Sequence, residues 1–292
     1  MKCLIDADVL LHELGWSGQF PDKETKEEIL FPFDKVADML DEKIRIICHE
    51  CDADEPPTLY ISSSDQAVKM WNRSAPYVGR PELSHEPNFR YLVGKTKPYK
   101  GTRHNPKPFH FYNILAYMLA NYEVVMSSGG LEADDEVCIA QRTAIDEGRE
   151  TTICSRDKDL RICAGRHYSW ECGKQAAIGP ETTDTFGWLD KKANGEVYGY
   201  GLIFFLFQML TGDSADNIPG LPKVGAVGAW NILNKVKDKK EALSLVKKKY
   251  KEVLGDQSKD YFLEQGSLLW MVQRRDEPFS IERLLSGNIR SE

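Results

Sequence analysis

The sequence predicts an α/β protein with a mostly parallel sheet flanked by helices, followed by a helical C-terminal region. Over residues 1–199, short apolar segments typical of strands alternate with helical patterns, as in parallel sheets. Acidic side chains follow several of these strands, where open α/β sheets place their functional sites. From residue 200 onward only helical patterns remain, so we expect two domains, 1–199 and 200–292.

The expected strands are short apolar runs, and the expected helices repeat apolar residues every three or four positions. The strands are 2–10, 59–61, 123–126, 151–155 and 167–172, and the helices are 33–51, 109–122, 130–147, 202–210, 239–254 and 259–275. Pro56-Pro57 ends the first helix, and Gly148 ends the third. For residues 173–200 the sequence predicts only turns or a hairpin.

Composition is that of a soluble globular protein, with 41% hydrophobic and 28% charged residues in 292. No apolar run approaches the length of a membrane span, and Asp6 comes too early for a signal peptide. We therefore expect a cytoplasmic monomer with no membrane partner. Cys48-His49-Glu50-Cys51 is half of a structural zinc motif, but no second such motif follows, which disfavours zinc.

Carboxylates recur just past strand or helix ends. They are Asp6, Asp65, Glu132, Asp134, Asp135, Asp157, Asp159, Asp213 and Asp216. The simplest explanation for the group at 132–135 is that acids favour the first turn of a helix. If the acids instead meet in space, their repulsion requires cations, and hard oxygen ligands favour Mg²⁺ or Mn²⁺. Two such ions suit phosphodiester hydrolysis.

Basic residues gather separately, in residues 69–107, although the chain has a net charge of −7. They are Lys69, Arg73, Arg80, Arg90, Lys95, Lys97, Lys100, Arg103 and Lys107. Tyr77, Phe89, Tyr91 and Tyr99 are interleaved with them. Bases mixed with aromatic rings favour a surface that binds single-stranded nucleic acid, and the alternative is an ordinary solvated loop.

At this point the chain resembles a known family, the structure-specific 5′ nucleases (flap endonuclease or 5′–3′ exonuclease), in particular the stand-alone bacteriophage type. The resemblance covers residues 2–235. It is carried by three motifs in order: Gly130-Leu131-Glu132-Ala133-Asp134-Asp135, then Ser155-Arg156-Asp157-Lys158-Asp159, then Gly212-Asp213-Ser214-Ala215-Asp216-Asn217-Ile218-Pro219-Gly220 leading into Val224-Gly225-Ala226-Val227-Gly228. It implies a PIN-like nuclease domain with an arch or gateway at about 69–107, and a helix–hairpin–helix segment that binds duplex DNA.

The resemblance also implies roles for individual residues. Glu132, Asp134 and Asp135 would sit at a first metal ion, Asp213 and Asp216 at a second, Asp157 and Asp159 between the two, and Asp6 and Asp65 at the edge of the pocket. Lys100 and Arg103 would contact the scissile phosphate, while Tyr99 would stack on a terminal base. Lys97 belongs to the same basic segment. Around the glycine-rich hairpin, Lys223, Gly225, Val227 and Gly228 would contact duplex DNA, with a K⁺ ion held by carbonyls.

The activity implied is Mg²⁺- or Mn²⁺-dependent hydrolysis of DNA with 5′ single-stranded ends, flaps or nicks, in replication or repair, in the host cytoplasm if the chain is phage-encoded. Two alternatives remain. Ile5-Asp6-Ala7-Asp8-Val9 and Gly212-Asp213-Ser214-Ala215-Asp216 also resemble the motifs of haloacid-dehalogenase phosphatases. A non-catalytic protein that binds branched DNA is the second alternative.

Overall fold

The computed structural model describes residues 1–22, 24–102 and 106–286. The chain divides into two compact units. The first, which we call the sheet unit, comprises Met1–Asn88, Asn105–Lys158 and Gly165–Thr182. The second, the helical unit, comprises Phe89–His104, Asp159–Ala164 and Thr183–Glu292. Three stretches that precede residue 200 in the sequence, namely 89–104, 159–164 and 183–199, therefore group with the C-terminal helices.

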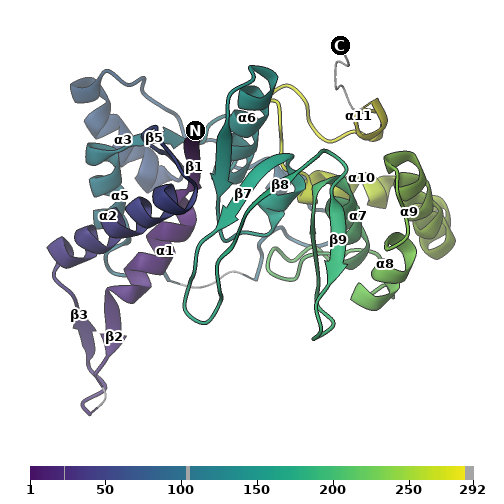
Figure 1. Ribbon diagram of the computed structural model, residues 1–292, viewed down its shortest axis with the longest axis horizontal. Coiled ribbons are helices and arrows are strands. Elements are labelled where there is room, and N and C mark those ends of the chain that lie inside the picture. Colours follow the sequence, from purple (N-terminus) through teal and green to yellow (C-terminus); the bar gives the residue numbers. More distant parts are fainter. Residues whose placement is uncertain (23, 103–105, 287–292) are drawn as a thin grey trace. The chain divides into compact units, whose positions relative to one another are not determined.

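The sheet unit is built on a six-stranded sheet with the order β5-β4-β1-β6-β7-β8 (Figure 1). The strands are β1 (Lys2–Asp6), β4 (Thr58–Ile61), β5 (Glu123–Met126), β6 (Thr151–Cys154), β7 (Gly165–Ser169) and β8 (Ile178–Thr183). β1 pairs in parallel with β4 on one side and with β6 on the other. The chain thus reverses its direction of travel across the sheet next to β1, where α/β sheets form their binding crevice. The expected mostly parallel α/β architecture is confirmed.

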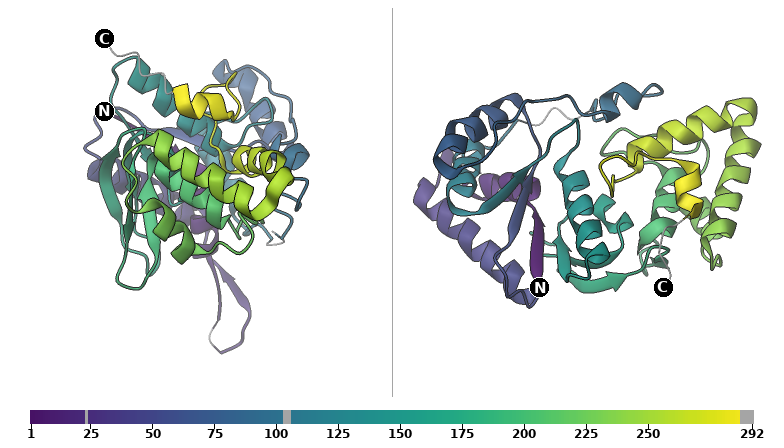
Figure 2. Two further views of the ribbon diagram at one scale, coloured as in Figure 1. Left: turned by 90° about the vertical axis from the view of Figure 1, so that its right-hand side faces the viewer. Right: turned by 90° about the horizontal axis from the view of Figure 1, so that it is seen from above.

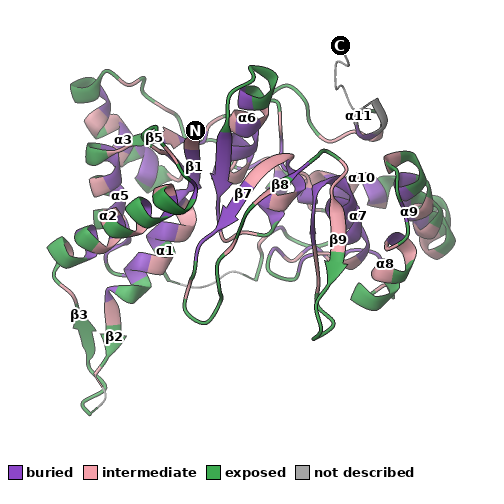
Figure 3. Ribbon diagram, viewed as in Figure 1, coloured by how far each residue is buried: buried purple, intermediate pink, exposed green. Residues whose placement is uncertain are grey.

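Helices cover both faces of this sheet (Figures 1 and 2). α1 (Ala7–Ser17), α2 (Phe33–Glu50), α3 (Asp65–Val78) and α5 (Phe111–Asn121) pack together on one side, and α6 (Ala133–Asp146) packs against β1 and β6 on the other. The central strands are buried, whereas the hairpin of β2 (Gln19–Pro21) and β3 (Glu28–Leu30) is largely exposed (Figure 3).

The expected strand at 2–10 is wrong beyond Asp6, because α1 begins at Ala7. Ala7, Leu10, Leu11 and Leu14 are buried, and their spacing is that of one helix face rather than of a strand. Asp8 consequently lies in the first turn of a helix. The expected helix at 259–275 is also too long, since α10 ends at Leu269.

The helical unit surrounds α7 (Gly201–Thr211), whose residues 201–210 are all buried. A helix that is apolar on every side belongs in a core. α7 packs against α8 (Ala226–Leu233), α9 (Lys239–Leu254), α10 (Ser258–Leu269), the 3₁₀ turn Asp159–Ile162, and the hairpin of β9 (Trp188–Lys191) and β10 (Val197–Tyr200). Around these elements, α4 (Arg90–Val93) packs against α10, α11 (Ile281–Ser286) against α9, and the 3₁₀ turn Gly255–Gln257 against α9 and α10. Among the described residues, no helix has both the length and the apolar character needed to cross a membrane.

A glycine pair closes the loop that follows α7. Gly212 and Gly220 have φ values of 73° and 65°, and each backbone lies against the other. Between them, the backbone groups of Asp213 and Ile218 exchange hydrogen bonds of 2.8 and 2.7 Å. A side chain on either glycine would collide with backbone, so both positions require glycine.

We predict that Gly212→Ala unfolds the protein at lower temperature than Gly148→Ala does. Both positions have positive φ, 73° and 68°, but a Cβ at 212 would lie 2.3 Å from the Ile218 carbonyl oxygen, while 148 faces open space. The left-handed conformation alone costs about 1 kcal/mol, so Gly148→Ala sets the baseline. Equal melting temperatures in thermal unfolding would contradict the proposed loop geometry.

A candidate metal centre in the sheet unit

Asp6 lies at the carboxyl end of the central strand, beside the point where the strand order reverses. Its side chain is almost fully buried, with 2% of the residue exposed. The Ser155 hydroxyl donates to its Oδ2 atom at 2.7 Å, whereas Oδ1 accepts no hydrogen bond from the residues that the structure describes. A buried carboxylate oxygen without a donor is unusual and indicates a missing electropositive partner.

Burial raises the pKa of Asp6 to about 7, and the negative charges of Asp8 and Asp157 act in the same direction, while the Ser155 hydroxyl and the Val9 backbone N–H oppose them. These three carboxylates are therefore close enough to repel one another. A divalent cation would offset this repulsion and would give Oδ1 its partner. The oxygen donors suit Mg²⁺ or Mn²⁺, so the residues present fit such an ion.

Ser62 connects Asp8 to the start of α6. The Ser62 backbone N–H donates to both carboxylate oxygens of Asp8, at 3.1 and 3.2 Å. The Ser62 hydroxyl in turn accepts a hydrogen bond from the Ala133 N–H at 2.9 Å. The first turns of α1 and α6 are thereby held beside the end of β4.

Acidic residues at the start of α6 form a capping box. The Glu132 N–H donates to Asp135 Oδ2 at 3.1 Å, and the Glu132 side chain accepts from the backbone N–H of Asp135. Asp135 is fully buried and is thus fixed by the helix cap, whereas Asp134 is partly exposed. The helix-cap explanation therefore holds for Glu132 and Asp135. It leaves the Asp134 carboxylate outside the capping box.

The remaining sheet-unit acids differ in their surroundings. Asp157 follows β6, and its N–H donates to the Ser155 hydroxyl at 2.8 Å, so Ser155 joins it to Asp6. Asp65 is exposed in the first turn of α3, whose N-cap is Ser64. No hydrogen bond between described residues connects the Asp65 carboxylate to the other acids.

Asp159, Asp213 and Asp216 belong to the helical unit and are buried there. Gln208 on α7 donates from Nε2 to Asp159 Oδ1. Asp213 Oδ1 accepts from the Ala215 N–H at 2.8 Å. The Asp216 carbonyl accepts from the Lys100 N–H at 2.9 Å, which brings the basic segment against the acidic loop.

Residues 89–102 of the basic segment are fixed to α10. The buried guanidinium of Arg90 donates to the carbonyls of Leu268 and Trp270, at 3.1 and 2.7 Å. Glu264 accepts from the N–H groups of Lys95 and Thr96 at 2.8 and 2.6 Å. Arg90 therefore has a structural role, because it anchors this segment to the end of α10.

Three side chains expected to bind nucleic acid lie further along this segment. Lys97 is exposed, and Lys100 Nζ lies 5.0 Å from the centroid of the Tyr99 ring. Only 4% of Tyr99 is exposed, and its ring contacts that of Tyr91, which is 55% exposed. Tyr91 is therefore the accessible ring at this position. Arg103 lies outside the described residues.

The glycine-rich hairpin is exposed at all four positions expected to contact duplex DNA: Lys223, Gly225, Val227 and Gly228. Gly225 is the N-cap of α8, so the first backbone N–H groups of this helix point away from its hydrogen-bonded body. A Cβ at Gly225 would meet open space, and one at Gly228 would lie 3.6 Å from a Val224 methyl group. Packing within the chain thus does not require glycine at either position.

Sequence reasoning missed Ser62, Ser155 and Gln208, which hold the acids in place. Ser62 and Ser155 directly follow β4 and β6. A small hydroxyl residue just after a strand in an acidic motif is a usable signal, because it can bridge two strand ends. Gln208 gave no such signal, since it lies inside an apolar helix.

Comparisons with known proteins agree with this architecture. No family model matches the chain. It is 32% identical over 111 residues to DNA polymerase I of Rhizobium leguminosarum (37% of this chain, 10% of the relative), and 28% identical over 171 residues to a 5′-3′ exonuclease of Buchnera aphidicola (56% and 55%). DNA polymerase I of Bacillus caldotenax is 28% identical over 178 residues (58% and 18%). The chain thus spans about half the length of the exonuclease and less than a fifth of the length of either polymerase.

The fold is similar to that of a T5 protein co-crystallised with metal ions, with a TM-score of 0.51, 14% identity, and coverage of 93% of this chain and 89% of that one. The expected PIN-like fold is confirmed by this likeness. The expected resemblance to 5′ nucleases is confirmed by the sequence relatives together with this fold.

We predict that Asp6 makes the metal-free protein less stable as the pH rises from about 4 to about 7. Its pKa is near 3.8 when unfolded and is raised to about 7 in the fold, so the folded state binds the proton more tightly. The stabilisation is fully present below the lower value and is lost as the pH passes the upper one, by at most about 1.4 kcal/mol per pH unit.

Urea unfolding in the presence of a chelator measures this effect. Asp6→Asn keeps an oxygen for Ser155 but has no charge, so the stability of the wild type relative to this variant should fall over that pH range. If the free energies of unfolding of the wild type and of Asp6→Asn differed by the same amount at every pH, the raised pKa of Asp6 would be contradicted.

Proposed function

We propose, from its place among the 5′ nucleases, that the chain hydrolyses phosphodiester bonds of DNA at or near 5′ ends, as an exonuclease, a flap endonuclease or both. The proposal rests on one observation above all. Asp6 is buried at the carboxyl end of the central strand, and its Oδ1 atom accepts no hydrogen bond from the described residues. Asp8 and Asp157 lie close enough to raise its pKa. Such a centre is suited to holding a divalent cation.

In this proposal Asp6, Glu132, Asp134, Asp135 and Asp157 hold Mg²⁺ or Mn²⁺ in the sheet unit. When bound, the cation polarises the phosphate and lowers the pKa of water. Ser155 orients Asp6 through Oδ2 and leaves Oδ1 available. The capping box orients the start of α6. A second ion, held by Asp213 and Asp216 with Asp159, and a supporting role for Asp65 follow from the family resemblance and stay proposals.

Lys100 would stabilise negative charge that develops on the phosphate, as preorganised cations do in phosphoryl chemistry. Two contacts support this role. Its backbone N–H is held by the Asp216 carbonyl at 2.9 Å, and the Asn217 side chain holds the preceding turn through the Pro98 carbonyl at 2.9 Å. The backbone of Lys100 is thus fixed while its amine remains on the side chain's flexible stem. Arg103 would share this role.

The basic segment would bind the single-stranded 5′ end. Lys97 supplies charge for the phosphates, and Tyr91 supplies the accessible ring on which a base can stack. Tyr99 would support the Tyr91 ring and would stack on a base only if it became exposed. The anchoring of this segment by Arg90 and Glu264 would keep both contacts in place.

The glycine-rich hairpin would hold the adjacent duplex through the exposed amides at the start of α8 and through Lys223, with K⁺ coordinated by carbonyls. Helix N-termini attract phosphate because their first N–H groups are unpaired and the helix dipole is positive there.

The sequence relatives are nucleases or polymerases, and they favour a nuclease over a phosphatase as the function of this chain.

We predict that Asp134→Asn strongly slows Mg²⁺-dependent cleavage of a 5′-flapped duplex while binding survives. Loss of one carboxylate ligand should lower kcat about 100-fold or more, equivalent to about 3 kcal/mol. The matched control is Asp146→Asn at the exposed far end of the same helix, where the carboxylate forms an ion pair with Arg142. End-labelled flap, nicked, blunt and single-stranded substrates with and without Mg²⁺ give the measurement.

In that assay, undiminished cutting by Asp134→Asn would refute the metal assignment. Binding by the wild type without any Mg²⁺-stimulated cleavage would instead identify a non-catalytic protein that binds branched DNA.

We predict that Gly228→Ala stabilises α8 and weakens binding to duplex DNA. Alanine is better than glycine in a helix by about 1 kcal/mol, and the methyl group meets only Val224 at 3.6 Å. On the exposed face it would obstruct the approach of a phosphate. Thermal unfolding and fluorescence anisotropy with a labelled duplex measure the two effects, and tighter or unchanged binding would exclude this surface.

A further inference from the structure

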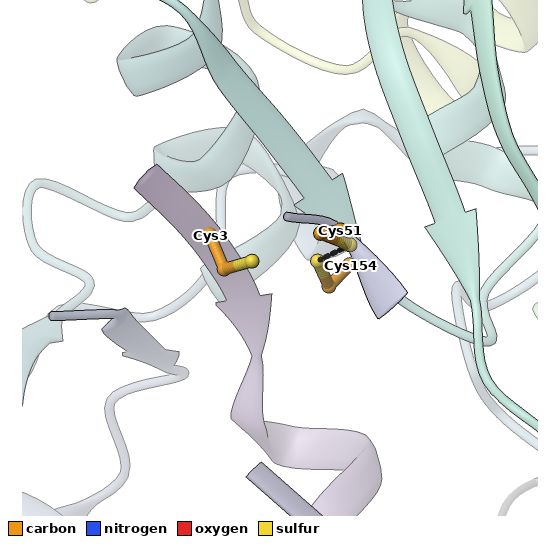
Figure 4. Close-up of side chains that lie close together, drawn as sticks. All are labelled: Cys3, Cys51 and Cys154. Atoms are coloured by element: carbon orange, nitrogen blue, oxygen red, sulfur yellow. Dashed lines mark hydrogen bonds between the residues drawn. The ribbon is translucent and has the colours of Figure 1, made fainter. Parts of the chain in front are cut away.

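Three cysteines from distant parts of the sequence meet inside the sheet unit. Cys3 lies on β1, Cys154 ends β6, and Cys51 follows the last turn of α2 (Figure 4). All three are fully buried and are free thiols. Their Sγ atoms lie within 4.8 Å of one another, and those of Cys51 and Cys154 are 3.7 Å apart. Figure 4 shows the three sulfur atoms close together, with the contact between Cys51 and Cys154 drawn.

The strand register explains why Cys3 and Cys154 share one face of the sheet. Cys3 is opposite Thr152, and Ile5 is opposite Cys154. Residues two apart on a strand point to the same side, so Cys3 and Cys154 are diagonal neighbours. Cys51 reaches this face from α2, and Cys48, one helical turn earlier, is partly buried beside Cys3, with which its thiol interacts.

The distance between the sulfur atoms of Cys51 and Cys154 is that of neighbouring ligands in a metal thiolate site. Zn–S bonds of about 2.3 Å at tetrahedral angles place neighbouring sulfur atoms about 3.8 Å apart. The observed distance of 3.7 Å between Cys51 and Cys154 agrees with this edge. Mutual approach of three thiols is more than a disulfide requires, because a disulfide uses only two.

A positive charge also lies beside the cluster, because the guanidinium of Arg166 is close enough to Cys51 to act on it electrostatically. Arg166 is held there by its hydrogen bond to the Cys51 carbonyl at 2.8 Å. A fixed positive charge beside the cluster would partly balance the negative charge of a thiolate site.

We propose that Cys3, Cys51 and Cys154, with Cys48 as the fourth ligand, form a site for a thiophilic d¹⁰ cation, Zn²⁺ or Cu⁺. Each coordinating thiol releases its proton to solvent, and no electron is transferred. The ion would tie the first strand and β6 to the end of α2. Thiolate ligands suit these ions, whereas carboxylates suit Mg²⁺ or Mn²⁺, so this site is chemically distinct from the acidic centre. The proposal does not depend on the proposed nuclease function.

The full chain, purified under reducing conditions without added metal, is first tested by elemental analysis for zinc and copper. The metal-free protein is then titrated with Co²⁺ in excess Mg²⁺, which keeps the carboxylates occupied. Sulfur-to-cobalt charge-transfer absorption that saturates at one ion per chain, and that Zn²⁺ abolishes, is expected for the zinc form. Capture of one Cu⁺ from a chromogenic Cu⁺ chelator, without a cobalt signal, would identify the copper form.

Variants locate the site. Cys51→Ser and Cys154→Ser should lose the metal signal, and Cys172→Ser, which removes a free thiol outside the cluster, should retain it. Cys48→Ser alters a partly buried position, so its folding can be checked by circular dichroism, and weaker Co²⁺ binding is expected.

The proposal is overturned if folded wild-type protein with free thiols gives no sulfur-to-metal absorption and takes up no Cu⁺. A disulfide between Cys51 and Cys154 in the non-reduced peptide map of freshly purified protein would overturn it equally, since the cluster would then be a redox pair.

Discussion

The main physical constraint in this structure is the repulsion among carboxylates around Asp6, an acid buried at the centre of a mostly parallel sheet. Asp6 has lost its contact with water, keeps one oxygen without a donor, and lies within range of two further negative charges. Burying such a charge is unfavourable by several kcal/mol unless a cation or proton compensates it. Ser155 and Ser62 hold the strand ends in this arrangement, so the unfavourable geometry belongs to the fold itself. Groups of this kind are typical of functional sites.

Much of this arrangement was predictable from the sequence because it is local. Apolar runs followed by acids identified β1, β4 and β6, and the helical period identified α2, α5 and α6. The boundary between β1 and α1 was missed because Ala7 and Leu10 read equally well as a continuing strand. Hydrogen bonds from Ser155 to Asp6 and from Ser62 to Asp8 depend on the parallel pairing of strands far apart in sequence. No local pattern contains that information.

The grouping of residues 89–104 with the C-terminal helices could not be predicted either, because it also depends on contacts between residues far apart in the sequence. Arg90 is one base among many in the sequence, yet in the fold it is buried and anchors the chain to the end of α10. Charge counting treats every arginine as a solvent-facing cation, so it overstated the surface charge of this segment. Glu264, which holds Lys95 and Thr96, gave no sequence signal because it lies in an unrelated helix. Which of the two contacting rings, Tyr91 or Tyr99, is accessible for stacking was likewise known only from the exposure of each side chain in the fold.

β1 and β6 carry two kinds of ligand atom. Cys3 and Cys154 present sulfur to the packed interior, whereas Asp6 and Asp157 present oxygen at the carboxyl edge of the same strands. Soft and hard donors separated in this way would select different ions without competition. In the proposed site, the half motif Cys48-x-x-Cys51 would be completed by Cys3 and Cys154, which lie singly on strands. A search of the sequence for a second short motif could not reveal such a partner.

The central claim, that these acids form a cation site, is tested most directly by titrating Mn²⁺ into metal-free protein and following bound Mn²⁺ by electron paramagnetic resonance. Saturable binding by the wild type that weakens strongly in Asp6→Asn is the result this account predicts. Wild-type protein that binds no Mn²⁺, or an Asp6→Asn variant that binds it equally well, would contradict it.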